Sequence, residues 1–164
     1  MQLLIKQRVF SWTDKYDVYD GYGNVKYSVK GEFFSLGHRL HVYDARGNEV
    51  GVVKQKLLTI LPVFELEING KTVGRVERKF SMFRPKYDVD FRGWRAEGDF
   101  LNWNYEVWQA CSMAARITKK LLAWGDTYVL EYADPADELP ALMLVLAIDA
   151  ANSDKEKEKD KDKE

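Results

Sequence analysis

The fold of this chain depends on one stretch near its carboxyl end: Leu139-Pro140-Ala141-Leu142-Met143-Leu144-Val145-Leu146-Ala147-Ile148. Asp137 and Glu138 precede this stretch, and Pro140 falls in its first turn, which predicts a helix with Asp137 as the N-cap. A helix that is apolar on every side must be buried on every side. Ten residues of helix span only about 15 Å, half of a bilayer core. The stretch therefore predicts a helix over about 137–151 inside the protein's own core, in preference to membrane insertion or an oligomerisation segment.

Upstream of this helix the chain carries a repeat of hairpin signals. Val18–Asn24 and Val42–Asn48 share the order Val-Tyr-Asp, two further residues, then Gly-Asn. An Asp before a turn can accept hydrogen bonds from amides two residues on, and Gly adopts the positive φ that a reversal requires. Further turns are expected at Asn69-Gly70 and Arg92-Gly93, so the four turn glycines are spaced by 24, 23 and 23 residues. This spacing predicts successive antiparallel hairpins.

The segment from Ala110 to Trp124 allows two interpretations. Its apolar residues recur at helical spacing, but Ile117–Leu122 matches Val53–Leu58 in residue type, position by position. We follow the repeat and predict a strand that turns at Gly125-Asp126 into a further strand, Thr127–Tyr132. Many short antiparallel strands are typical of sandwiches and barrels. With the central helix, the predicted fold is mainly β, a closed or nearly closed antiparallel barrel of hairpins.

Composition predicts one domain and one tail. At 164 residues the chain fits a barrel domain over residues 1–152, followed by a disordered charged tail over 153–164 in which acids and lysines alternate. Outside that tail 20 basic and 20 acidic side chains remain, and this balance argues against nonspecific binding of nucleic acid. Cys111 is the single cysteine, and residues 1–10 lack a secretory core, so we expect a cytoplasmic protein.

Three segments stand in a distinctive order: Gly31–Gly37, then Tyr43–Glu49 running into Lys54–Lys56, then Trp124–Tyr128 followed by the apolar helix. In this order they resemble the LURP-one-related family of the tubby C-terminal-like superfamily. The resemblance spans about Leu3 to Ala151. It implies a twelve-stranded antiparallel barrel around a central C-terminal helix. Tubby-like members of the superfamily bind phosphoinositides through basic side chains, and we carry none of those ligand positions over to this sequence.

No set of residues has the types and spacing of a catalytic or metal site. His38 and His41 fall on opposite faces of a strand, and an apolar neighbourhood makes Cys111 an inert core thiol. Ser35 lacks the flanking glycines of a hydrolase elbow. We therefore expect no enzyme and no cofactor.

The basic residues are more informative than these candidates. Lys56, Lys79 and Lys120 hold the same position in three aligned repeats, each just before an apolar residue. We expect a local basic rim that binds an anionic headgroup or a membrane-associated partner, placing the protein at the membrane periphery. The simpler alternative is a solvated strand edge on which lysines discourage edge-to-edge pairing. The predicted rim consists of Lys54, Lys56, Arg78, Lys79, Lys119 and Lys120.

Two other function classes remain open. In a protein-interaction or structural module without a lipid ligand, exposed aromatic side chains would serve as anchors, for example Trp12, Tyr22, Trp103 or Trp108. A ligand-binding barrel or an enzyme would need interior space, which the central helix fills. The sequence carries no signal for an oligomeric state.

Overall fold

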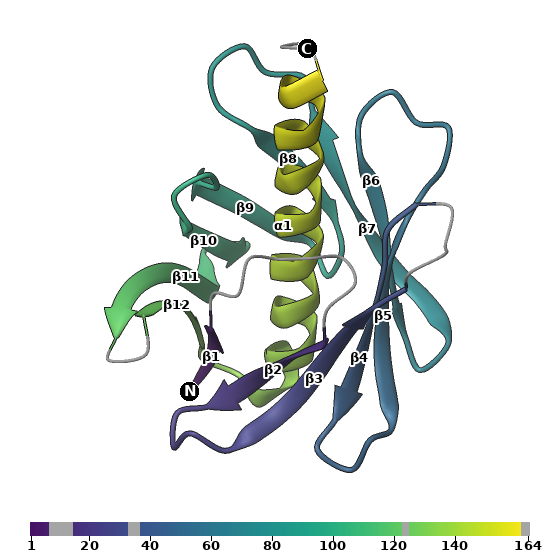
Figure 1. The fold of residues 1–164 in the computed structure, drawn as a ribbon. Helices are drawn as coiled ribbons and strands as arrows, with labels where there is room; N and C mark the ends of the chain where they lie inside the picture. Colours follow the sequence, from purple (N-terminus) through teal and green to yellow (C-terminus); the bar gives the residue numbers. More distant parts are fainter. Residues whose placement is uncertain (7–14, 33–36, 123–124, 162–164) are drawn as a thin grey trace.

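A computed structural model shows, over the residues that it describes, twelve strands in one antiparallel sheet that wraps around a single C-terminal helix (Figure 1). The structure describes residues 1–6, 15–32, 37–122 and 125–161, with side chains omitted for 121–126 and from 153 on. The strands are β1 (Gln2–Lys6), β2 (Lys15–Asp20), β3 (Val25–Gly31), β4 (Arg39–Asp44), β5 (Glu49–Gln55), β6 (Val63–Ile68), β7 (Lys71–Lys79), β8 (Lys86–Asp90), β9 (Trp94–Asp99), β10 (Asn104–Gln109), β11 (Ser112–Leu122) and β12 (Gly125–Tyr132).

The sheet order is β8-β7-β6-β5-β4-β3-β2-β1-β12-β11-β10-β9. Pairing of β1 with β12 joins the two halves of the chain, and the edge strands β8 and β9 contact each other without a hydrogen-bonded ladder between them. The barrel is therefore nearly closed. This confirms the predicted barrel of hairpins with its central C-terminal helix.

The predicted turns form as the repeat indicated. Asp20 Oδ1 accepts from the amides of Tyr22 and Asn24, each at 2.9 Å, and Gly23 has a φ of 87°. Asp44 makes the same two bonds in the next unit, also at 2.9 Å. Hydrogen bonds to these turn carboxylates lower the pKa of both aspartates. The largest cause is the bond from the Asn24 backbone at Asp20 and the bond from the Asn48 side chain at Asp44. Identical local chemistry thus produces identical reversals.

The ambiguous segment 110–124 is a strand, because β11 pairs along its length with β10 and β12. Two details differ from expectation. Gly125 and Asp126 do not form the turn but belong to β12, where they pair with Leu122 and Leu121; residues 123–124 lie outside the described residues. Cys111 is exposed and not an inert core thiol, because Ala110 adopts a φ of 51° in the tight turn between β10 and β11.

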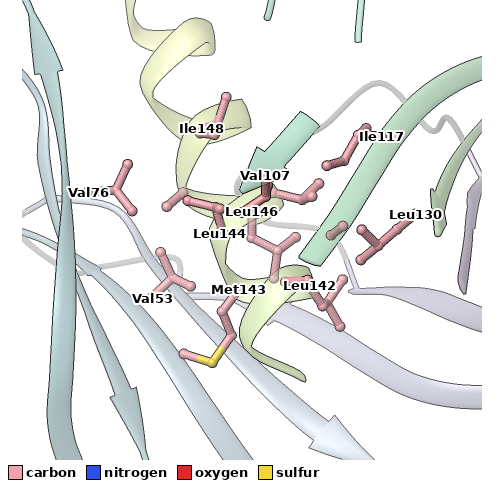
Figure 2. Packing of buried hydrophobic residues seen from close by; sticks show 14 of the residues in the cluster. Val53, Val76, Val107, Ile117, Leu130, Leu142, Met143, Leu144, Leu146 and Ile148 are labelled. Atoms are coloured by element: carbon pink, nitrogen blue, oxygen red, sulfur yellow. The ribbon is translucent and has the colours of Figure 1, made fainter. Parts of the chain in front are cut away.

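Helix α1 (Glu138–Lys161) fills the barrel. The side chains of residues 142–148 are all at most 1% exposed, as the apolar decapeptide predicted. Figure 2 shows Val53 and Val76 on one side of the helix and Ile117 and Leu130 on the other, so strands from both halves of the sheet cover it. Burying each large aliphatic side chain contributes about 1.5–3 kcal/mol, which makes this helix the centre of the core.

The ends of the helix differ from the prediction of 137–151. A 3₁₀ turn, Pro135–Asp137, comes first, and its N-cap is Asp134, whose carboxylate accepts from the Ala136 amide at 2.9 Å. Asp137 is not the N-cap: it is buried and ion-paired with Arg92 at 2.9 Å. The helical backbone continues to Lys161, into the segment expected to be disordered, because Lys and Glu are good helix formers once a buried turn has started the helix. The division into domain and tail stays a prediction.

Candidate functional site

The predicted basic residues all lie toward one end of the barrel. In an antiparallel sheet alternate strands run the same way, so β5, β7 and β11 all finish at the same end. Only β6 separates β5 from β7, whereas five strands separate β5 from β11 in either direction round the sheet. The structure therefore brings Lys54, Lys56, Arg78 and Lys79 together and places Lys119 and Lys120 on the opposite side.

The four clustered residues are not equivalent. Arg78 turns inward, and its Nη1 donates to the carbonyl oxygen of Ala151 at 3.2 Å, so its guanidinium anchors the helix. Lys54 is half-buried opposite Glu65 in the β5–β6 ladder. Lys56 and Lys79 stand at the surface, and each side chain is 47% exposed.

Carboxylates accompany the two surface lysines. Lys56 Nζ lies 3.3 Å from Glu65 Oε1, and Lys79 Nζ lies 3.3 Å from Glu77 Oε1 and 3.5 Å from Asp88 Oδ2. Ion pairs at this exposure contribute about 0–1 kcal/mol. An anionic ligand can therefore replace these partners at little cost.

Two loops beside these lysines expose large apolar side chains. Residues 56–62 join β5 to β6, and residues 80–85 join β7 to β8. Leu58 and Ile60 are fully exposed, while Phe80, Met82 and Phe83 are 80% to 91% exposed. Such a concentration of solvated apolar side chains on one edge of a molecule marks a surface of interaction.

The backbone holds both loops in place. The Lys56 amide donates to the Val63 carbonyl at 2.8 Å, and the Arg78 amide donates to the Pro62 carbonyl at 2.9 Å, which fixes the first loop against β7. Lys79 and Lys86 are ladder partners at the base of the second loop. Figure 1 shows both loops at the end of the barrel where the helix emerges.

An open hollow of about 360 Å³ lies against the first loop, lined by residues that include Gln55, Lys56, Leu57, Ile60 and Pro62. Leu58, another lining residue, has a φ of 61°, a conformation that costs a non-glycine residue about 1–2 kcal/mol. Backbone strain of this kind concentrates at functional sites. The loop thus holds an apolar side chain in water at a conformational cost.

We call the exposed and basic residues of these two loops and their bases the loop patch. It contains Leu57, Leu58, Ile60, Phe80, Met82, Phe83, Lys54, Lys56, Lys79, Arg84 and Lys86.

A different cluster holds the helix at the opposite end of the barrel. Glu138 accepts hydrogen bonds from Lys26 Nζ at 2.6 Å and from the Tyr27 hydroxyl at 2.7 Å, and it also accepts from the Tyr132 hydroxyl. Burial opposes ionisation of this carboxyl, but the three hydrogen bonds outweigh it and lower the pKa of Glu138. Burial and the same carboxylate raise the pKa of both tyrosines. The four side chains bond to one another across the start of the helix, so this cluster is structural.

His41 also has a structural role. Its Nδ1 lies 2.6 Å from Glu49 Oε2 and its Nε2 lies 2.7 Å from Glu32 Oε1. The two carboxylates sit at different nitrogens of the ring and so do not converge on one point. The hydrogen bond from His41 is the main cause that lowers the pKa of Glu32.

Comparison with known proteins places this architecture in a family. The family model described as LURP-one-related matches residues 1–149. The chain belongs to the LURP-one-related family. It is 32% identical over 149 residues to the uncharacterized protein YxjI of Bacillus subtilis (strain 168), covering 91% of this chain and 92% of that relative. A solved structure of an Arabidopsis thaliana protein is similar with a TM-score of 0.61 and 17% identity, over 90% of each chain, which supports the fold.

The structure describes three of the four aromatic residues predicted as protein anchors in this LURP-one-related chain, and of these three only Tyr22 is nearly fully exposed. Trp103 is buried and stacks on Tyr128 with ring centroids 3.7 Å apart, because a φ of 53° folds its loop back over the barrel. Trp108 is half-buried and Tyr22 is 95% exposed. Trp12, like Ser35, lies outside the described residues.

Sequence reasoning singled out Lys54, Lys56 and Lys79 of this LURP-one-related chain. It missed Arg84, Lys86 and the apolar half of the loop patch. The signal was present, because each lysine precedes an apolar run that falls between two paired strands and ends near a proline, Pro62 or Pro85. Apolar residues between strands are normally taken as core. Among the described residues, no helix is long and apolar enough to cross a membrane.

Proposed function

We propose that this LURP-one-related chain is a non-enzymatic module that binds anionic phospholipid surfaces through the basic residues of the loop patch. One observation carries the proposal: Lys54, Lys56, Lys79, Arg84 and Lys86 gather on one arc of one end of the barrel. Each basic group near an anionic membrane contributes about 1 kcal/mol. Several together suffice for reversible peripheral binding.

The charge of the rest of the molecule supports a local site. The sequence outside its last eleven residues is balanced in charge, so no broad positive field attracts every polyanion. The arc itself is different, because its five basic residues outnumber the three carboxylates that pair with them there, Glu65, Glu77 and Asp88. We propose a cytoplasmic protein at the membrane periphery on this basis.

Vesicle flotation tests the proposal. We expect binding to phosphatidylcholine vesicles that also contain phosphatidylserine, and no binding to phosphatidylcholine alone. The double variant Lys56→Glu, Lys79→Glu should bind on the order of tenfold or more weakly at low salt, since each reversal replaces an attraction by a repulsion. Indifference to anionic lipid would remove the proposal.

The barrel supplies a matched control. At the opposite end, Arg46 is exposed in the β4–β5 turn and Lys71 is exposed at the start of β7, so Arg46→Glu with Lys71→Glu changes net charge equally without touching the loop patch. This control should bind like the parent protein. Lys120→Glu should have a smaller effect than Lys56→Glu, because Lys120 lies across the barrel. Equal losses from all variants would show that net charge alone governs binding.

A protein-interaction module without a lipid ligand is the second candidate, favoured by the nearly full exposure of Tyr22 at the other end of the barrel. Lipid-independent recovery of one stoichiometric partner, lost on Tyr22→Ala, would support it over lipid binding.

A further inference from the structure

We infer that the two exposed loops of the loop patch insert their apolar side chains into the bilayer, so that the protein is anchored by burial as well as by charge. This inference rests on the proposed function, since lysines bring the loops to the surface. It adds a different mode of attachment. The inserted side chains are those of Leu58, Ile60, Phe80, Met82 and Phe83.

The position of these side chains carries the first step. The loops follow β5 and β7 and precede β6 and β8, four consecutive strands of the sheet. Neighbouring strands lie about 4.8 Å apart, so both loops lie within about 15 Å along one end of the barrel. A flat surface can therefore touch both loops at once.

The order of charge and hydrophobicity along each loop carries the second step. Lys54 and Lys56 come at the base of the first loop, before Leu58 and Ile60. In the second loop the ladder pair of Lys79 with Lys86 forms the base, and Phe83 lies beyond it. Each loop thus has an apolar tip and a basic base. In a membrane interface the tip would reach the acyl chains while the base stays at the level of the anionic headgroups.

The shape of the loops identifies a bilayer as the occupant. The apolar side chains project on two separate loops and are 80% exposed or more. The open hollow is lined by residues of the first loop and its base and by none of the second loop, so it does not form one groove along which a peptide or helix would contact both loops. The carboxylates near the bases, Glu65, Glu77 and Asp88, belong to the strands and not to the loops. A bilayer matches both features: its fluid acyl layer can receive two separate apolar loops, and its anionic headgroups can pair with the basic residues at their bases.

Site-specific labelling tests insertion directly. Cys111 is exposed in a turn, so Cys111→Ser gives a background in which one new cysteine can carry an environment-sensitive nitrobenzoxadiazole probe. Probes at Ile60→Cys and Phe83→Cys should brighten and shift to the blue on vesicles containing phosphatidylserine, and doxyl groups on the acyl chains should quench them. The matched control, Arg46→Cys at the other end of the barrel, should show neither change.

A binding measurement gives an independent readout. Charge-only attachment disappears at high salt, whereas inserted side chains resist it. We expect parent protein to remain partly bound at high salt, and Ile60→Ser with Phe83→Ser to bind at least tenfold more weakly there. Both side chains are exposed, so the variant should melt like the parent protein.

The outcomes separate the two proposals. Failure of the parent protein to bind anionic vesicles would overturn both. Salt-sensitive binding with unchanged probes at residues 60 and 83, and equal binding by the serine variant, would overturn insertion and leave charge-based attachment. A concentration-dependent self-association or a tight protein complex that buries these probes without vesicles would also overturn insertion.

Discussion

At the scale of single residues, two interior glycines show how closely the barrel fits its contents. A Cβ at Gly74 would lie 2.4 Å from the backbone oxygen of Asp90, and one at Gly51 would lie 2.7 Å from Met143 Sδ. The first obstacle is backbone in the neighbouring strand, and the second is a flexible side chain. The two positions should therefore tolerate a methyl group very differently.

We predict that Gly74→Ala lowers the free energy of unfolding by about 1–3 kcal/mol and that Gly51→Ala costs less. The physical reason is that the β7–β8 ladder must shift for the first change, whereas Met143 can change rotamer for the second. Urea denaturation measures both values. In a Met143→Ala background the cost of Gly51→Ala should shrink further; an unchanged cost would contradict the assigned contact.

Glu138 provides a prediction about pH. Its lowered pKa means that its contribution to stability is full above the unfolded value of about 4.5 and is lost as pH falls through the folded pKa. Glu138→Gln should cost about 1–3 kcal/mol at neutral pH through weakened bonds to Lys26, Tyr27 and Tyr132. The difference in urea midpoint between parent protein and variant should narrow as pH falls below 4.5. Parallel pH curves would show that this carboxyl is not coupled to folding.

At the scale of elements, the helix and the loops contain similar side chains in opposite settings. Leu144 is fully buried in α1, and Leu58 is fully exposed in the β5–β6 loop. Leu144→Ala should lower the free energy of unfolding by about 2–5 kcal/mol, because it leaves a cavity inside the barrel. Leu58→Ala should change it by less than about 0.5 kcal/mol. Thermal or urea unfolding compares the two directly, and a large loss from Leu58→Ala would show that the loop packs against the barrel.

The same contrast explains which elements could be predicted from sequence. Hairpin turns depend on local chemistry, so the Asp-to-Gly signatures at Asp20 and Asp44 located them correctly. The helix could be predicted because its apolar run is unbroken. A helix that is apolar on every side cannot lie on the surface of the barrel and must fill its interior. The repeat also decided correctly that Ile117 belongs to a strand, although its periodicity alone favoured a helix.

Features that depend on tertiary geometry were missed for a common reason. Cys111 and Trp103 lie at or beside residues with positive φ, which sequence pattern does not reveal, and their exposures came out reversed. The basic rim was predicted from equivalent repeat positions. The equivalence of repeat positions placed the lysines at one end of the barrel. It could not show that Lys120 lies on the opposite side of the barrel from Lys56.

At the scale of the whole molecule, the barrel has two chemically different ends. One end carries the loop patch, and the other carries the polar turns at Asp20 and Asp44 together with the Glu138 cluster. Binding through the loop patch would therefore orient the helix axis roughly perpendicular to the membrane surface. The polar turns at the other end would then face the solvent. The vesicle experiments, with variants at both ends, examine this polarity as well as affinity.

The pairing of β1 with β12 has a consequence for biosynthesis. The first strand finds one of its partners only after residues 125–132 have been made, and the helix that covers every interior face starts later still, at Glu138. The chain emerges from the ribosome with its amino end first, so the earlier hairpins appear while their apolar faces are still uncovered. The nascent barrel therefore cannot complete its core until helix α1 is available. We expect ribosome-bound intermediates to need chaperone protection until α1 leaves the exit tunnel.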